Sequence, residues 1–156
     1  MKFISNSLNE TKKIAEDFAS KLVPKGDDAL VVGLYGNLGA GKTSFTQLLA
    51  KHFGVIENVT SPTFVIEKIY PIRTNSRRRP TSNGASEFNH LIHIDAYRID
   101  FDKELINLGW EKIISDKNNL ILIEWPERVE KIMPEHIKVR FETLPGDSSR
   151  EIEILD

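Results

Sequence analysis

The sequence predicts a single α/β domain in which a mostly parallel central sheet is flanked by helices and carries antiparallel hairpin strands at its edge. Three observations lead to this prediction. Residues 36–43 read GNLGAGKT and fill the pattern G-x-x-x-x-G-K-[ST]. An apolar run at residues 29–35 precedes them, and an amphipathic stretch begins at Ser44. Two further apolar runs, residues 91–95 and 120–125, each have an acid at or near the end, which is typical of a P-loop NTPase domain.

The glycine-rich segment predicts a phosphate-binding loop. Glycines let the backbone curl so that successive N–H groups point inward, and the following helix adds its N-terminal dipole. Lys42 would bring a positive charge to the outer phosphates, and the Thr43 hydroxyl would hold Mg²⁺. A turn that only joins a strand to a helix is the alternative, and the flanking patterns argue against it. The residues expected at the nucleotide are Gly36, Asn37, Leu38, Gly39, Ala40, Gly41, Lys42, Thr43 and Ser44.

Length and composition limit the possibilities further. A chain of 156 residues, 40% hydrophobic and 28% charged, fits one globular domain over residues 1–156. The net charge of -2 argues against nucleic-acid binding over the whole surface, although not against a local basic patch. The chain has no cysteine, which excludes disulfides and thiolate chemistry. No signal-peptide core or membrane-spanning run is present, so we expect a cytoplasmic protein with no membrane partner.

The N-terminal half has the signals of two helices and a turn. Ser7 and Glu10 predict a capping box at the start of a first helix, whose apolar face is Ile14, Ala15, Phe18, Ala19 and Leu22. The helix after the phosphate-binding loop places Phe45, Leu48, Leu49 and Phe53 at helical spacing and ends at Gly54. A hydroxyl-rich turn then precedes a strand at residues 64–70. Its hydroxyls would act like switch residues that contact a terminal phosphate, or form an ordinary turn: Thr60, Ser61 and Thr63.

Residues 73–89 differ from the rest of the domain. They contain four arginines, one glutamate and few apolar side chains. This composition predicts a mobile loop inserted into the domain. The run Arg77, Arg78 and Arg79 is expected to be solvated, with RNA or an acidic partner as the alternative contact.

The C-terminal half alternates strands and helices. Leu105, Leu108 and Ile113 predict one helix over residues 103–114, and Pro126 starts a short helix that extends to residue 132. Residues 136–155 read as two alternating strands joined by a Pro-Gly turn, so an antiparallel hairpin is expected at the sheet edge.

Two acids complete the predicted site. Asp95 and Glu124 end apolar strands, and ligands of open α/β sheets lie beyond such strand ends. Glu124 is expected to hold Mg²⁺ directly or through water, and Asp95 to hold the metal or orient water. A lone acid more often caps a turn or pairs with a surface cation. The candidate catalytic residues are therefore Lys42, Asp95 and Glu124, and the candidate metal ligands are Thr43, Asp95 and Glu124.

A pair of histidines close to Asp95 raises the question of a separate zinc site. His93 shares a face with Asp95 and His90 points the other way, which argues against one. His93 is instead expected to orient Asp95 or to be a satisfied buried histidine.

Five segments together resemble the TsaE family, formerly YjeE, of bacterial tRNA threonylcarbamoyladenosine biosynthesis ATPases. They are GNLGAGKT, TSPTF, HIDAYR, ELINLG and IEWPERV, and they span nearly the whole chain. A P-loop is widespread, whereas H-x-D-x-Y-R and E-W-P-E-R are far more specific.

The resemblance implies an ATPase that uses Mg²⁺ and ATP to support or reset the partner proteins TsaB and TsaD. Those partners modify the adenosine next to the anticodon, so tRNA would be met only through the complex. The family's nucleotide and metal site corresponds to residues 36–43, Asp95 and Glu124. Thr11 and Arg150 resemble further positions near the nucleotide. Asn37 stands where the family usually has an acid, and residues 73–89 exceed the usual hairpin.

Two other activities remain open from the sequence. A small-molecule P-loop kinase would need a lid, for which residues 77–79 are the only candidate. A GTPase switch is disfavoured because no N-K-x-D segment is present, so adenine is expected. No arginine finger is evident, which predicts slow hydrolysis by the isolated protein and faster hydrolysis with partners.

Overall fold

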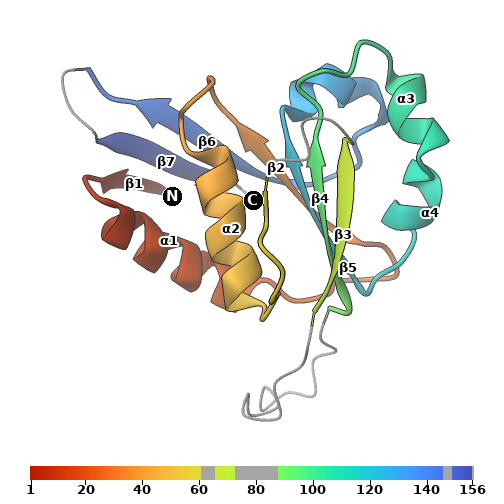
Figure 1. The fold of residues 1–156 in the computed structure, drawn as a ribbon, viewed down its shortest axis with the longest axis horizontal. Coiled ribbons are helices and arrows are strands. Elements are labelled where there is room, and N and C mark those ends of the chain that lie inside the picture. Colours follow the sequence, from red (N-terminus) through yellow and green to blue (C-terminus); the bar gives the residue numbers. More distant parts are fainter. Residues whose placement is uncertain (61–65, 73–87, 146–148, 156) are drawn as a thin grey trace.

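A mixed sheet forms the centre of the computed structural model, which describes residues 1–60, 66–72, 88–145 and 149–155. Within these residues the sheet has seven strands in the order β1-β7-β6-β2-β5-β4-β3 (Figure 1). The strands are β1 (Lys2–Ser5), β2 (Leu30–Tyr35), β3 (Glu67–Pro71), β4 (His90–Asp95), β5 (Asn119–Glu124), β6 (Ile137–Thr143) and β7 (Arg150–Leu155). The helices are α1 (Leu8–Lys21), α2 (Lys42–His52), α3 (Asp102–Asn107), α4 (Trp110–Ile114) and the 3₁₀ helix η1 (Pro126–Ile132).

The strand directions divide the sheet into a parallel centre and antiparallel flanks. Strands β6, β2, β5 and β4 run parallel to one another. The pairs β1–β7, β7–β6 and β4–β3 are antiparallel. The predicted α/β class is correct, but "mostly parallel" has to be corrected to mixed.

Strand β1 is the element that the sequence analysis missed. The predicted β6–β7 hairpin is present, but β1 pairs with β7 and takes the edge position expected for that hairpin. Four residues are too few to display a strand period, which is why the pattern of residues 2–5 gave no signal.

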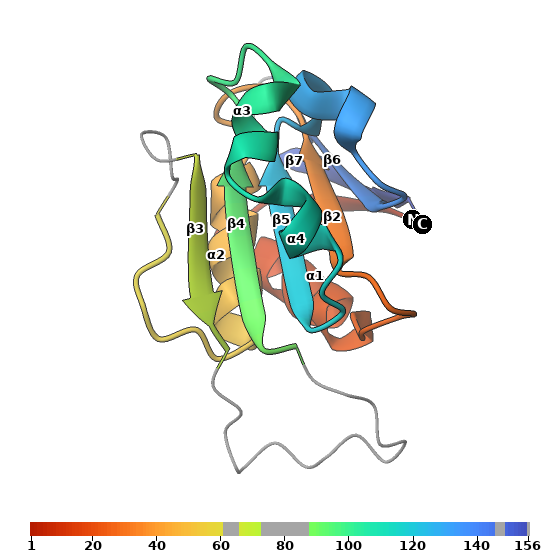
Figure 2. The same cartoon turned by 90° about the vertical axis from the view of Figure 1, so that its right-hand side faces the viewer.

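Helices cover the two faces of the sheet unequally. Helices α1 and α2 pack on one face, where Ala15, Phe18, Phe45 and Leu49 join side chains from β2, β4, β5, β6 and β7. Helices α3 and α4 and η1 pack on the other face, over β2, β4 and β5 (Figure 2). Strands β6 and β7 contribute no residue to this second cluster among the described residues. Strands β2, β4 and β5 are therefore enclosed on both sides, as parallel strands usually are, whereas β6 is covered by helices on one face.

Two predicted helices differ in detail from the structure. Ser7 Oγ accepts the N–H of Glu10 at 3.2 Å, but the Glu10 carboxylate accepts from Asn6, one residue before the cap. The single helix predicted over residues 103–114 is two helices, α3 and α4. They are separated because Gly109 has a φ of +90°.

The strand predicted over residues 64–70 begins later than expected. Strand β3 starts at Glu67, after Ile66 with a φ of +62°, and residues 64 and 65 lie outside the described part. Beyond β3, Ile72 N–H donates to Asn89 O at 2.8 Å, so the ends that flank residues 73–88 lie side by side. Of the described helices, none is both long and apolar enough to span a bilayer.

Candidate functional site

A tightly turned loop, residues 36–41, connects β2 to α2 and is called the glycine-rich loop below. Gly36 has a φ of +139°, and a side chain there would collide with the carbonyl oxygen of Phe141. Gly41 has a φ of +105°, and a side chain there would collide with the Arg150 guanidinium. Only glycine fits both positions. The loop leads directly into α2 at Lys42, as the motif predicts.

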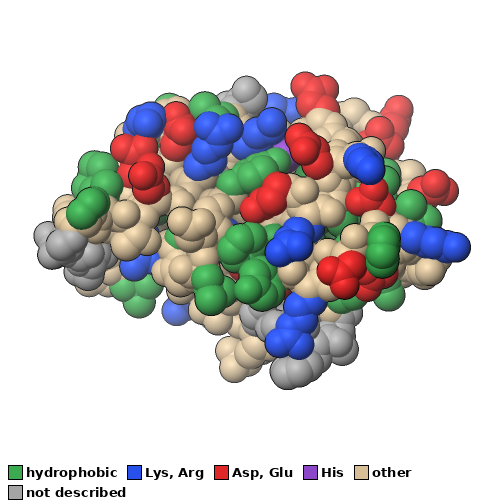
Figure 3. All heavy atoms as spheres, turned by 90° about the horizontal axis from the view of Figure 1, so that it is seen from above, with side chains coloured by type: hydrophobic (Ala, Val, Ile, Leu, Met, Phe, Trp, Pro, Cys, Tyr) green, Lys and Arg blue, Asp and Glu red, His purple; other side chains and the backbone are tan. Residues whose placement is uncertain are grey.

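A cavity of about 470 Å³ lies between this loop and the ends of β4 and β5. Its volume falls within the usual range for small-ligand sites. Figure 3 looks onto the molecule from above and shows acidic, basic and apolar side chains mixed on this face. The residues that line the cavity are Leu38, Gly39, Gly41, Lys42, Thr43, Ser44, Asp95, Tyr97, Arg98, Glu124 and Trp125.

The two predicted acids meet at this cavity. Asp95 and Glu124 are direct partners in the parallel register of β4 and β5, and they are only 8% and 3% exposed. Asp95 Oδ1 accepts the N–H of Tyr97 at 3.0 Å, and Glu124 Oε2 accepts the Thr43 hydroxyl at 3.0 Å. The structure therefore brings all three predicted metal ligands to one place.

The donor set fits Mg²⁺. Hydroxyl and carboxylate oxygens are the ligands that this ion prefers, and it commonly uses one or two carboxylates together with substrate phosphates. The described residues contain no group of three or more His, Cys, Asp or Glu side chains that could hold a metal ion. A site with two carboxylates would thus leave positions around the ion for phosphate oxygens and water.

His93 contacts a different acid from the one that the sequence suggested. Its side chain is fully buried, and Nε2 lies 2.9 Å from Glu124 Oε1. His93 pairs with Leu122 in the ladder, which makes Glu124 its diagonal neighbour on the same face. Asp95 lies two residues further along β4 on that face. The orienting role expected toward Asp95 is therefore corrected to a contact with Glu124.

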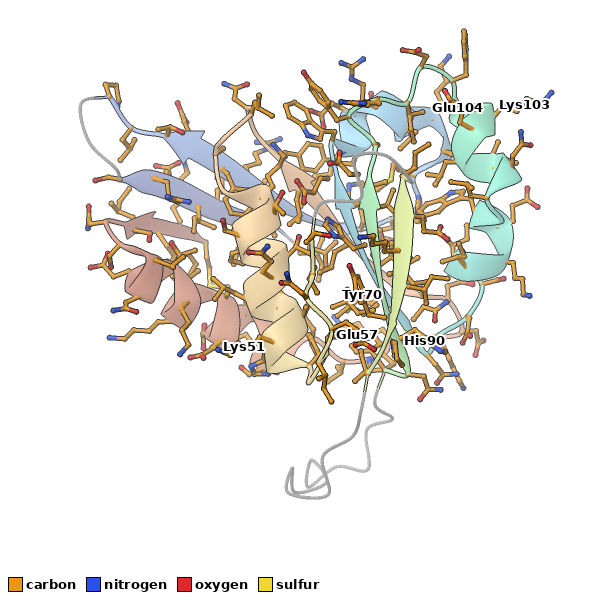
Figure 4. All side chains as sticks on the ribbon, viewed as in Figure 1. Lys51, Glu57, Tyr70, His90, Lys103 and Glu104 are labelled. Carbon is orange, nitrogen blue, oxygen red and sulfur yellow. The ribbon has the colours of Figure 1, made fainter. Side chains whose placement is uncertain are left out.

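His90 is separate from this group. It is exposed and begins β4 at the end opposite the cavity (Figure 4). The strand thus keeps the two histidines apart both by face and by position.

Lys42 is buried at the centre of the site. Its side chain is 4% exposed, and Nζ donates to the carbonyl oxygens of Gly36 at 2.6 Å and Asn37 at 3.0 Å. The ammonium also lies 3.8 Å from the centroid of the Trp125 ring. Burial lowers the pKa of Lys42, and the charges of Glu124, Glu127 and Asp95 oppose that shift. The site therefore holds a desolvated cation for which a phosphate would be a stronger partner than the loop carbonyls.

Three cavity residues were not predicted: Tyr97, Arg98 and Trp125. Trp125 has a left-handed backbone, with φ 60° and ψ 46°, and its ring lies 4.9 Å from that of Tyr97. Arg98 adds an arginine to the lining of the cavity, where the sequence had shown no evident arginine finger. The signal was present in the H-x-D-x-Y-R and E-W segments, whose remaining positions were given no role.

Other predicted residues lie at varying distances from the cavity. Arg150 packs against Gly41. Thr11 is buried outside the cavity lining, and its hydroxyl forms a 2.7 Å hydrogen bond with that of Ser5, whose ladder partner is Arg150. Thr60 is exposed, and its hydroxyl accepts from Lys68 Nζ at 3.0 Å. The remaining predictions lie outside the described residues: Ser61, Thr63 and Arg77 to Arg79.

A second cavity, of about 450 Å³, lies on the other side of the glycine-rich loop. Two residues that were expected at the nucleotide, Gly36 and Asn37, line this second cavity instead of the first. A third, Ala40, lines neither cavity and is buried in the hydrophobic core. The charged side chains of the second cavity form exposed ion pairs, of which Lys2–Glu151 is the shortest at 2.8 Å. The full lining is Lys2, Tyr35, Gly36, Asn37, Arg140, Phe141, Glu142, Thr143, Glu151 and Glu153.

Comparison with known proteins gives one consistent family. The profile described as threonylcarbamoyl adenosine biosynthesis protein TsaE matches residues 5–152. TsaE of Rickettsia prowazekii is 38% identical over 144 residues, which cover 91% of this chain and 86% of that protein. TsaE of Bacillus subtilis is 35% identical over 143 residues, covering 92% and 77%. The crystal structure of YdiB from Bacillus subtilis superposes with a TM-score of 0.69 at 29% identity, covering 97% of this chain and 82% of that one.

Proposed function

The chain belongs to the TsaE family, and from that premise we propose that it is a Mg²⁺-dependent ATPase of bacterial tRNA threonylcarbamoyladenosine biosynthesis. One observation carries the proposal: a buried lysine, a hydroxyl and two buried carboxylates line a single cavity beside the glycine-rich loop. These are the groups that phosphoryl transfer from a nucleoside triphosphate requires.

Binding of ATP would begin at the loop and at α2. Backbone N–H groups of the loop and the N-terminus of α2 would receive the phosphates. The Lys42 ammonium would exchange the carbonyls of Gly36 and Asn37 for phosphate oxygens. Because this cation is desolvated in the free protein, the exchange supplies binding energy that a surface lysine could not.

Hydrolysis would use the two acids differently. Thr43 and Glu124 would hold the metal ion, which when bound neutralises charge on the β- and γ-phosphates. Asp95, fixed by the N–H of Tyr97, would orient the water that bonds to the γ-phosphorus as the bond to the bridging oxygen breaks. Arg98 lines the same cavity, and its guanidinium would stabilise the charge that develops in the transition state.

The partners follow from the family. We propose that ATP turnover supports or resets a complex with TsaB and TsaD in the cytoplasm, and that tRNA is met only through that complex. We expect slow hydrolysis by the isolated chain and faster hydrolysis with the partners, as for NTPases whose transition state is completed by another protein.

The direct experiment measures phosphate release from ATP with Mg²⁺, with and without the TsaB–TsaD pair. Free phosphate that is stimulated by the pair, and absent with Lys42→Ala, supports the proposal. Transfer of the phosphoryl group to a nucleoside or alcohol acceptor would indicate a kinase instead. Tight selectivity for GTP in a competition assay would contradict the adenine assignment.

A further inference from the structure

We infer that His93 is a positioning residue, which holds the Glu124 carboxylate in the orientation that the metal site needs. The inference rests on the proposed function, since it assigns Glu124 as a ligand. It starts from a contact that the sequence did not predict: His93 Nε2 lies 2.9 Å from Glu124 Oε1.

The Glu124 carboxylate is held at both oxygens. Oε1 meets His93, and Oε2 accepts the Thr43 hydroxyl at 3.0 Å. The two contacts come from different elements, the neighbouring strand β4 and the first turn of α2. Rotation of the carboxylate about its last side-chain bond would break at least one of them. The plane of the carboxylate is therefore fixed by the surrounding protein.

The direction of the hydrogen bond follows from the chemistry. An ionised carboxylate only accepts, so Nε2 is the ring nitrogen that carries the proton. The other ring nitrogen, Nδ1, is buried and has no hydrogen-bond partner among the residues that the structure describes. Within the described part of the chain, the hydrogen bond to Glu124 is thus the one that this imidazole makes. A side chain that merely filled the core would not need that donor, since leucine has a similar volume.

The expected consequence is a change in metal affinity. Hydrogen bonds from outer groups set the orientation of metal ligands, and their loss commonly costs about 10- to 100-fold in metal affinity. Without His93, Oε1 would be a buried carboxylate oxygen lacking a donor, and the carboxylate would turn or draw in water. Contacts of the glycine-rich loop and Lys42 with the nucleotide would remain.

The test compares His93→Leu, which removes the donor, with His93→Gln, whose amide N–H reaches about as far as Nε2. His90→Leu, at the exposed far end of the same strand, is the matched control. Manganese binding in the presence of ADP is measured by electron paramagnetic resonance, because Mn²⁺ substitutes for Mg²⁺ and no turnover is needed. The Mg²⁺ concentration for half-maximal phosphate release is measured in parallel.

We expect His93→Leu to weaken Mn²⁺ binding about 10- to 100-fold. KM for ATP at saturating Mg²⁺ should change less than about threefold, and His93→Gln should restore most of the metal affinity. His90→Leu should match the wild type. Unchanged metal binding in His93→Leu, or equal losses in the Leu and Gln variants, would overturn the inference.

A third variant distinguishes loss of metal binding from failure to fold. If His93→Leu does not fold, His93→Asn replaces it, because its shorter amide keeps the polarity but does not reach Glu124. Metal affinity near that of the wild type for Gln and weak for Asn supports the inference, and equal affinities overturn it. If the wild type releases no phosphate yet binds Mn²⁺ with ADP, the proposed ATPase activity fails while the role of His93 is still decided.

Discussion

Two cavities of nearly equal size flank the glycine-rich loop, one of about 470 Å³ toward β4 and β5 and one of about 450 Å³ toward β6 and β7. The first encloses Lys42, Asp95 and Glu124, none more than 8% exposed. The second is bordered by ion pairs whose lysine and arginine side chains are 61% and 57% exposed. Volume alone would not separate them.

The difference comes from how the sheet is covered. Helices on both faces desolvate the strands that end at the first cavity, so its charges interact through protein instead of water. Beside the second cavity, the face of β6 and β7 opposite α1 carries alternating charges without a helix layer among the described residues. Its ion pairs are screened and contribute little. The candidate site therefore differs from the second cavity in that its charged side chains are buried.

The largest effect should come from Lys42→Ala. Loss of the buried cation is expected to reduce phosphate release by about 10³-fold or more and to weaken ATP binding. The matched change at the second cavity, Lys2→Ala, should leave turnover within about twofold, since that cation is screened by solvent. Steady-state phosphate release and calorimetric ATP binding measure both. A large loss in Lys2→Ala would erase the contrast between the cavities.

Glu124→Gln comes next. Removal of one negative charge from the metal site should lower turnover by about 10²-fold at low Mg²⁺, with partial recovery as Mg²⁺ is raised. Glu153→Gln, an acid of the second cavity, is the control and should keep the Mg²⁺ dependence of the wild type. Magnesium titrations of phosphate release measure both variants, and an unshifted curve for Glu124→Gln would remove that residue from the metal site.

Arg98→Ala should have an intermediate effect. We expect kcat to fall about 10- to 100-fold with little change in KM, less than the loss of a fully engaged arginine finger, because Arg98 is exposed. Arg140→Ala, from the second cavity, should be neutral. If KM for ATP rises while kcat is unchanged, Arg98 serves binding and not the transition state.

The smallest effect concerns Glu67, which lies apart from both cavities. Burial raises the pKa of this carboxyl, and its Oε2 finds no hydrogen-bond partner in the described part of the chain. As the pH rises above the ordinary value, the unfolded chain loses this proton first, so the folded state loses relative stability. Glu67→Gln should therefore raise the free energy of unfolding at pH 7.5 by no more than about 1 kcal/mol, with a higher melting temperature, and should raise both by less at pH 4.5. Thermal unfolding at both pH values checks the sign.

The elements that the sequence predicted correctly are those in which the apolar spacing continues over enough residues to be recognised, or which flank a specific motif. Helices α1 and α2, strands β2, β4 and β5 and the β6–β7 hairpin all follow from apolar spacing. Strand β1 was missed because its partner, β7, is nearly 150 residues away and its own four residues have no period. The break at Gly109 was visible but was read as part of a helix, because the apolar spacing continued through it.

For the candidate site, the sequence predicted the main side chains that line the cavity but not all the contacts between them. Lys42, Thr43, Asp95 and Glu124 meet because the strand ends of a parallel sheet lie together. The pairing of His93 with Glu124 depends on the register between β4 and β5, which no single strand encodes. Arg98 and Trp125 follow the two acids in turns, whose conformations periodicity does not predict.

Because Asp95 and Glu124 are paired in the register of β4 and β5, insertions or deletions within either strand would separate the two acids. One residue inserted into β5 before Glu124 would send that carboxylate to the face that packs on α3 and α4. Two inserted residues would restore the face but displace it by about 6.6 Å along the strand. Insertions and deletions should therefore collect ahead of His90 and Asn119, and strands β4 and β5 should keep their lengths together as the family diverges.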